Sequence, residues 1–278
     1  MTLGFALNER VNCWMLMAAS VLLLAGLSGC SGGAARVNET TVSSTEVMTT
    51  SDEPEVRRRA RLRLELATGY FAQGQTTVAL DEVKQVLVID PSFADAHNLR
   101  GLIYMRLNDP RLAEDSFKRA VALNGRDADA LHNYGWFLCQ NGRYAESFDV
   151  FSQALTTPLY RNQVKTLLAK GLCEIRTGDR AQAEISLARA YELDAGNPVT
   201  GYNLALLLYL RGEYTRAQFY IRRINNSELA NAETFWLGIR VERRMNNPVA
   251  ELQLASQLKQ RFPKSKEAAA YERGAFNE

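Results

Sequence analysis

Apolar residues along most of this chain follow two periods at once. From Arg57 onward, alanine, leucine, valine and aromatic residues return every three or four positions, which is the spacing of one face of an α-helix. The same pattern repeats at a longer interval of roughly 34 residues, with a glycine near the middle of most units. The two periods together predict an all-α array of helix–turn–helix units.

Alignment on alanine and glycine divides this part of the chain into six units and a remainder. The sixth unit is degenerate, with Gly238, Ala250 and Leu254 before Phe262. We expect 265–276 to form a short helix that caps the last unit. The predicted units are 60–93, 94–127, 128–161, 164–197, 198–230 and 231–264.

The spacing within each unit has a mechanical reason. Small residues at the eighth and twentieth positions let the two helices approach closely, and the central glycine permits the turn. Each helix pair leaves an apolar face that the next pair covers, so stacking makes one continuous core. In these features the units resemble tetratricopeptide (TPR) repeats. The resemblance implies a right-handed superhelix of about six repeats over 56–278.

The first helix of each repeat lines the concave groove of a TPR superhelix, and many of the groove positions in this chain are apolar. Apolar surface of this extent usually marks an interaction site. We expect the groove to bind an amphipathic helix or an extended apolar segment of a protein. The alternative is tighter packing that buries several of these side chains. The predicted groove residues are Leu64, Phe71, Leu102, Met105, Trp136, Leu168, Leu172, Ile175, Tyr202, Leu206 and Tyr209, with Phe235 and Ile239 read in the sixth repeat.

The residues that most enzymes and metal sites require are scarce. The only histidines are His97 and His132, and neither has a second plausible ligand at helical spacing. Phosphate-binding, serine-hydrolase and zinc-protease motifs are absent from the sequence. The formal net charge is +2, which gives no reason to expect a nucleic-acid partner. We therefore expect no catalysis, cofactor, metal or small-molecule substrate.

Cys139 and Cys173 lie 34 residues apart, at nearly equivalent places on the first helices of the third and fourth repeats. Equivalent helices of adjacent repeats are neighbours, so the geometry allows a disulfide. In an exported protein, paired thiols are usually oxidised. The alternative is two buried free cysteines that behave as small apolar residues.

The N-terminal stretch has the pattern of a targeting signal. No charge occurs between Arg10 and Arg36, and the apolar run at 14–27 is short for a membrane span. It ends in Leu-Ser-Gly-Cys at 27–30, which resembles the lipobox of bacterial lipoproteins. By that resemblance 1–29 is a signal peptide and Cys30 carries the lipid that anchors the mature chain. A transmembrane anchor is the alternative.

The residues that follow Cys30 indicate a tether and a destination. Ser31 stands where lipoproteins kept in the inner membrane usually carry aspartate, so we expect the periplasmic face of the outer membrane. Residues 30–55 are rich in serine, threonine and acidic residues without an apolar period, which is typical of a flexible linker.

Three stretches go beyond a generic repeat: LHNYGWFLC at 131–139, FWLGIR at 235–240 and LKQRFPKS at 258–265. With the lipobox and six repeats, they resemble the PilF/PilW family of type IV pilus biogenesis lipoproteins, called pilotins. The resemblance implies an outer-membrane adaptor that binds secretin subunits and promotes their localisation or multimerisation. It also implies lipid on Cys30 and, as in some members, a bridge between Cys139 and Cys173. The alternative is a TPR lipoprotein that scaffolds another envelope machine, such as outer-membrane protein assembly or a peptidoglycan hydrolase.

Overall fold

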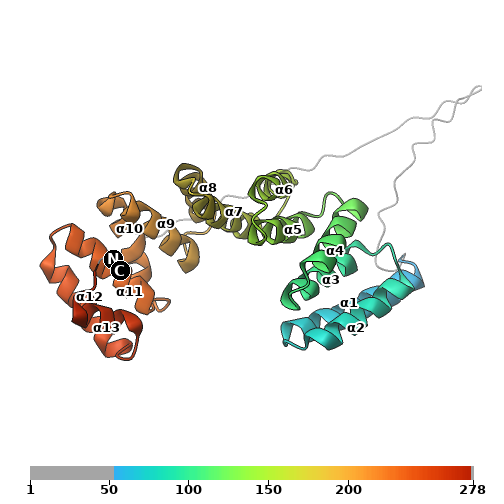
Figure 1. Cartoon of the computed structure of the whole chain (residues 1–278), viewed down its shortest axis with the longest axis horizontal. Helices are drawn as coiled ribbons and strands as arrows, with labels where there is room; N and C mark the ends of the chain where they lie inside the picture. Colours follow the sequence, from blue (N-terminus) through green and yellow to red (C-terminus); the bar gives the residue numbers. More distant parts are fainter. Residues whose placement is uncertain (1–52, 277–278) are drawn as a thin grey trace, which may run out of the picture. The chain divides into compact units, whose positions relative to one another are not determined.

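The structure is a computed structural model in which residues 53–276 are described (Figure 1). The predicted signal peptide, Cys30 and all but the last residues of the predicted tether lie outside this range. Within it the regular structure is entirely α-helical, in elements joined by short turns. The helices are α1 (Glu55–Ala72), α2 (Thr76–Ile89), α3 (Ala94–Arg106), α4 (Pro110–Leu123), α5 (Ala128–Gln140), α6 (Tyr144–Thr156), α7 (Gln163–Thr177), α8 (Arg180–Leu193), α9 (Pro198–Leu210), α10 (Tyr214–Asn225), α11 (Ala232–Arg244), α12 (Pro248–Arg261) and α13 (Lys266–Arg273).

The helices are arranged as consecutive antiparallel pairs. Each odd-numbered helix from α1 to α11 packs against the helix that follows it, and the second helix of a pair packs against the first helix of the next. Successive odd-numbered helices also touch directly, α1 with α3, α3 with α5, α5 with α7 and α9 with α11. The additional helix α13 contacts α11 and α12. The all-α array of helix pairs with a C-terminal capping helix, as predicted, is confirmed.

The turn inside every pair contains one residue with a left-handed backbone, a conformation that glycine and asparagine adopt with least strain. The φ angle is 78° at Gly74 in the first turn and 53° at Asn246 in the last. The sequence predicts glycine at this place, but two of the turns have asparagine instead. The residues are Gly74, Asn108, Gly142, Gly178, Gly212 and Asn246.

The position of the last turn corrects the predicted register of the sixth repeat. Asn246 follows Gly212 by the same 34 residues that separate Gly74 from Asn108. Counting back from Asn246 starts this repeat at 232 instead of 231, and Ile239 instead of Gly238 takes the eighth position. The difference of one residue changes which side chains of α11 face outward.

Close helix contacts explain the small residues at the eighth position of the middle repeats. A Cβ atom added to Gly101 would lie 2.6 Å from the ring of Phe117, and one added to Gly135 would lie 2.8 Å from the ring of Phe151. Both phenylalanine side chains are completely buried. Since neither ring has room to move, glycine sets the distance between the helices of these pairs.

Among the helices of residues 53–276, none combines the length and the apolar character needed to cross a bilayer.

Candidate protein-binding face

The predicted groove residues lie on one face of the odd-numbered helices, which we call the odd-helix face. Nine of the eleven side chains are partly exposed, and Ile175 on α7 reaches 36% exposure. The other eight are less exposed than Ile175, so neighbours cover most of each side chain and this face is less open than the sequence suggests. The nine are Phe71, Leu102, Met105, Trp136, Leu168, Leu172, Ile175, Tyr202 and Leu206.

Four residues assigned to the groove are buried instead. Leu64 packs in the core that α1 forms with α2 and α3, and Tyr209 lies under the guanidinium of Arg240, 4.8 Å from the ring centre. Phe235 and Ile239 are completely buried because the register of the sixth repeat is displaced by one residue. The prediction of exposure at these four positions is therefore wrong.

The corrected register brings different residues of α11 onto the odd-helix face. In a TPR superhelix the groove is lined mainly by the second, fifth, ninth and twelfth positions of each repeat. In the sixth repeat these positions are occupied by Glu233, Trp236, Arg240 and Arg243. The sequence reading missed all four. Asn246 carried the necessary signal, because asparagine is the residue that most readily replaces glycine in a left-handed turn.

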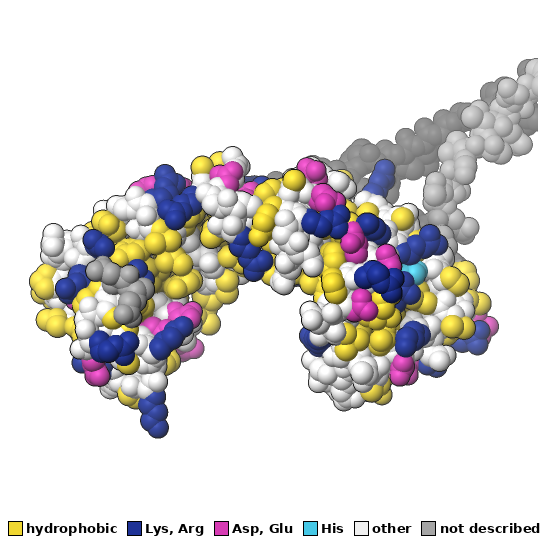
Figure 2. Space-filling view, in the orientation of Figure 1, with side chains coloured by type: hydrophobic (Ala, Val, Ile, Leu, Met, Phe, Trp, Pro, Cys, Tyr) yellow, Lys and Arg dark blue, Asp and Glu magenta, His cyan; other side chains and the backbone are white. Residues whose placement is uncertain are grey.

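A hollow of about 360 Å³ opens between α9, α11 and α13, and we call it the C-terminal hollow. Tyr202 and Leu206 of the predicted groove contribute to it, together with Trp236, whose ring stacks on Phe276 at a centroid distance of 5.4 Å. Charged side chains complete the wall. In Figure 2, hydrophobic side chains gather over α9 to α11, with lysine and arginine side chains beside them. The charged lining residues are Glu233, Arg240, Lys266, Glu267 and Arg273.

A second, more polar hollow of about 750 Å³ adjoins the first through Arg240, which lines both. Arg243 and Arg244 also line it, and Arg243 is paired with Glu251 at 3.0 Å. Burial alone would raise the pKa of Tyr209, but hydrogen bonds and the charges of Arg244 and Arg240 outweigh burial and lower that pKa. The lowered pKa reflects the positive potential of this region.

A buried polar network fixes the position of α11, the helix that carries these arginines. The carboxylate of Glu242 is almost completely buried and accepts hydrogen bonds from Gln218 (2.9 and 3.0 Å), Arg222 (2.9 Å) and Asn247 (2.9 Å). Because its donors come from α10 and from the turn before α12, the network holds three consecutive helices together. The arginines of α11 therefore project from a rigid support.

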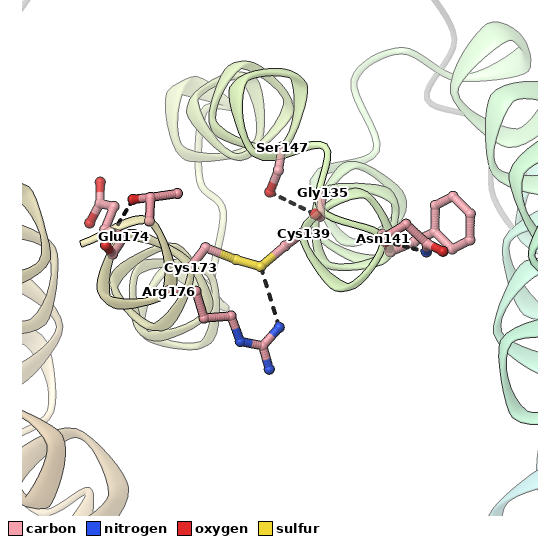
Figure 3. The surroundings of a disulfide bond; sticks show 9 residues. Gly135, Cys139, Asn141, Ser147, Cys173, Glu174 and Arg176 are labelled. Atoms are coloured by element: carbon pink, nitrogen blue, oxygen red, sulfur yellow. Dashed lines mark hydrogen bonds between the residues drawn. A yellow bond between two sulfur atoms is a disulfide. The ribbon is translucent and has the colours of Figure 1, made fainter. Parts of the chain in front are cut away.

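Cys139 and Cys173 are joined by a disulfide between α5 and α7 (Figure 3). Their Cα atoms lie 6.1 Å apart, and both residues are buried. The side chain of Arg176 points toward the bond, with Nη1 3.8 Å from the Sγ of Cys139. The same guanidinium lies 5.4 Å from the ring centre of Trp136 on the odd-helix face. The bridge thus links the first helices of two repeats beside that face.

Both histidines are buried and bonded within the fold. His97 Nε2 lies 2.9 Å from the carbonyl oxygen of Pro91, and His132 Nδ1 lies 2.9 Å from Thr166 Oγ1. Burial lowers the pKa of His132 to about 4, with a further contribution from the charge of Lys165. In the described part of the chain, no group of three or more histidine, cysteine, aspartate or glutamate residues is placed to hold a metal ion.

The chain is similar to tetratricopeptide repeat families and to proteins of type IV pili. A tetratricopeptide repeat family matches 99–163, and a TPR repeat family matches 69–108. The type IV pilus assembly protein PilF of Pseudomonas aeruginosa is 30% identical over 90% of this chain and 95% of its own length.

Solved structures extend the similarity to the fold. The structure of Pseudomonas aeruginosa PilF has a TM-score of 0.71 and 28% identity, covering 80% of this chain and all of that one. The crystal structure of PilW, a widely conserved type IV pilus biogenesis factor, has a TM-score of 0.69 and 28% identity, covering 79% of this chain and 99% of that one. Given the 30% identity with PilF over 90% of this chain and the shared array of helix pairs, the chain belongs to the PilF/PilW family of type IV pilus TPR proteins.

Proposed function

We propose that this protein is a lipid-anchored adaptor of type IV pilus biogenesis that binds secretin subunits and promotes their localisation or multimerisation in the outer membrane. The observation that carries the proposal is the identity with PilF across nearly the whole of both chains. A match of that extent includes the tether and the repeats together, so it supports a shared role for the whole molecule and not only a shared repeat.

The odd-helix face supports a protein as the ligand. Leu172 and Ile175 on α7 are partly exposed, and neither belongs to the packed cores of the described residues. Apolar side chains that are exposed in the free protein contribute most to the binding free energy when a partner removes them from water. An adaptor that binds through shape and apolar contact also needs no catalytic group.

Co-purification with the pilus secretin tests the binding role. The full chain with a C-terminal tag should retain the secretin from detergent-solubilised envelopes, and Ile175→Glu should reduce the amount retained at least tenfold, because it places a charge on the binding face. Ile185→Glu is the matched control, since Ile185 is 62% exposed on α8, which is not an odd-numbered helix. Absence of the secretin from repeated preparations, or equal losses in both variants, contradicts this role. Recovery of an outer-membrane assembly protein or a peptidoglycan hydrolase instead favours the scaffold alternative.

Cys30→Ser tests the anchor, which lies outside the described residues. A serine cannot accept the thioether-linked lipid, so the variant should leave the outer-membrane fraction while the circular dichroism of its helical repeats is unchanged. Stable anchoring needs two or more acyl chains. Because the proposal places all of them on Cys30, the variant should be almost absent from the outer-membrane fraction. A variant that still floats with outer membranes contradicts lipid anchoring through this residue.

A further inference from the structure

Arg240 occupies an unusual position at the junction of the two hollows. Its side chain is half-buried and stacks on Tyr209, yet its Nε atom is buried without a hydrogen-bond acceptor among the described residues. By contrast, Arg222 and Arg243 on the same part of the fold pair with Glu242 and Glu251. A buried donor without an acceptor is destabilising in the free protein, and a ligand relieves this cost only where the surrounding side chains shift enough to let its acceptor reach Nε.

The charges around Arg240 are unbalanced in favour of cations. Five basic and three acidic side chains line the two hollows. Lys266 lies 3.8 Å from Glu233 and 3.6 Å from Glu267, and Arg243 pairs with Glu251, so each acidic side chain has a cation beside it. Arg240, Arg244 and Arg273 form no ion pair within residues 53–276. The region therefore presents guanidinium groups that no carboxylate of the described residues neutralises.

Part of the lining of the C-terminal hollow is apolar. Tyr202, Leu206 and Trp236 provide an aromatic and aliphatic surface directly beside Arg240. A flat anionic membrane would reach the exposed cations but would not fill a recessed apolar space. A peptide reaches both, because neighbouring residues supply a carboxylate and an apolar side chain.

We propose that the C-terminal hollow binds an acidic segment of a protein partner, with a carboxylate paired to Arg240 and an adjacent apolar side chain packed on Tyr202, Leu206 and Trp236. Guanidinium and carboxylate match in a two-bond geometry that a lysine does not provide. The segment would continue from the hollow along the apolar part of the odd-helix face. This inference rests on the proposed function, because it specifies the chemistry of the partner segment that the adaptor would bind.

Peptide binding to the full chain in detergent tests the inference. The probe is a fluorescent, acetylated and amidated hexapeptide of alternating aspartate and leucine, and its matched control replaces every aspartate by asparagine. Fluorescence anisotropy should show that the aspartate peptide binds at least tenfold more tightly, because charge-assisted bonds are lost in the control. Equal affinity for the two peptides overturns the inference.

Arginine variants localise the effect. Arg240→Gln should weaken binding of the aspartate peptide about tenfold and leave the asparagine peptide nearly unchanged. Arg273→Gln, on an exposed residue of the wall, should weaken it about threefold, which keeps the test valid if Arg240→Gln folds poorly. Arg223→Gln on α10 removes an exposed positive charge away from the hollow and should have no effect. Wild-type affinity in both hollow variants overturns the proposed site.

Two further outcomes separate the alternatives. Displacement of the peptide by monomeric short-chain phosphatidylglycerol, at concentrations where phosphatidylcholine has no effect, identifies a lipid headgroup as the occupant and overturns the peptide assignment. Failure of the peptides to differ, while the secretin still co-purifies with the wild-type chain, overturns this inference alone. Peptide discrimination without any secretin in the co-purification overturns the proposed function alone.

Discussion

Loss of the Cys139–Cys173 disulfide is expected to lower the free energy of unfolding by about 3 kcal/mol. The two cysteines are 34 residues apart in sequence, and closing a loop of that length restricts the unfolded chain by about 3–4 kcal/mol at 25 °C. We place the expected value at the lower end because disulfides often deliver less than the chain-entropy figure.

The place of the bond in the array adds a second consequence. In repeat proteins each unit contacts only its neighbours, so the whole domain unfolds together only if every interface is strong enough. The disulfide reinforces the contact between α5 and α7, which lies near the middle of the array. Without it, the first three and the last three repeats should unfold less cooperatively, and the urea transition should broaden.

Urea denaturation followed by circular dichroism measures both effects. The oxidised wild-type chain is compared with the same chain in reductant and with the double variant Cys139→Ala, Cys173→Ala. Reductant should destabilise the wild-type chain and leave the double variant unchanged, which serves as the control for reduction of other cysteines. If reductant leaves the wild-type transition where it was, the bridge does not stabilise the fold.

The repeats could be predicted from sequence because their spacing reflects direct contacts. Gly101 and Gly135 must be small to meet Phe117 and Phe151, so they mark the helix pairs clearly. The same logic failed in the sixth repeat. There Gly238 is small for another reason, since an added Cβ would lie 2.5 Å from the side-chain nitrogen of Asn225. Gly238 therefore resembles a close-contact glycine one position too early, and the sequence predicts the wrong register for this repeat.

The binding face was less predictable than the fold. Periodicity identifies the side of a helix that points away from its partner, but it does not show how far long side chains from the next repeat reach across. Tyr209 is buried in the core that α9 shares with its neighbours, and Arg240 of the next repeat lies over its ring. The C-terminal hollow also depends on α13 and Phe276, which follow the last repeat and obey no repeat pattern. Such sites depend on how different segments meet in space.

Protonation of His132 is expected to make this protein less stable in mild acid. Burial lowers the pKa of its imidazole from 6.5 to about 4. Between these two values the unfolded chain binds a proton that the folded chain does not, so stability is retained above about pH 6.5 and is lost as the pH falls toward 4. The difference in pKa corresponds to a loss of about 3 kcal/mol at pH 4.

The variant His132→Asn isolates this contribution from that of the carboxylates, which also titrate in acid. Asparagine can still bond to Thr166, whose Oγ1 lies 2.7 Å from the hydroxyl of Tyr160, but it cannot take up a proton. At pH 7.5 the variant should be less stable than the wild-type chain, because it loses the packing of the imidazole near the ring of Phe151, at a centroid distance of 6.0 Å. As the pH falls to 4, urea denaturation should show the difference shifting by about 3 kcal/mol in favour of the variant. A difference that stays constant over this range would mean that His132 becomes protonated in the folded chain as readily as in the unfolded one.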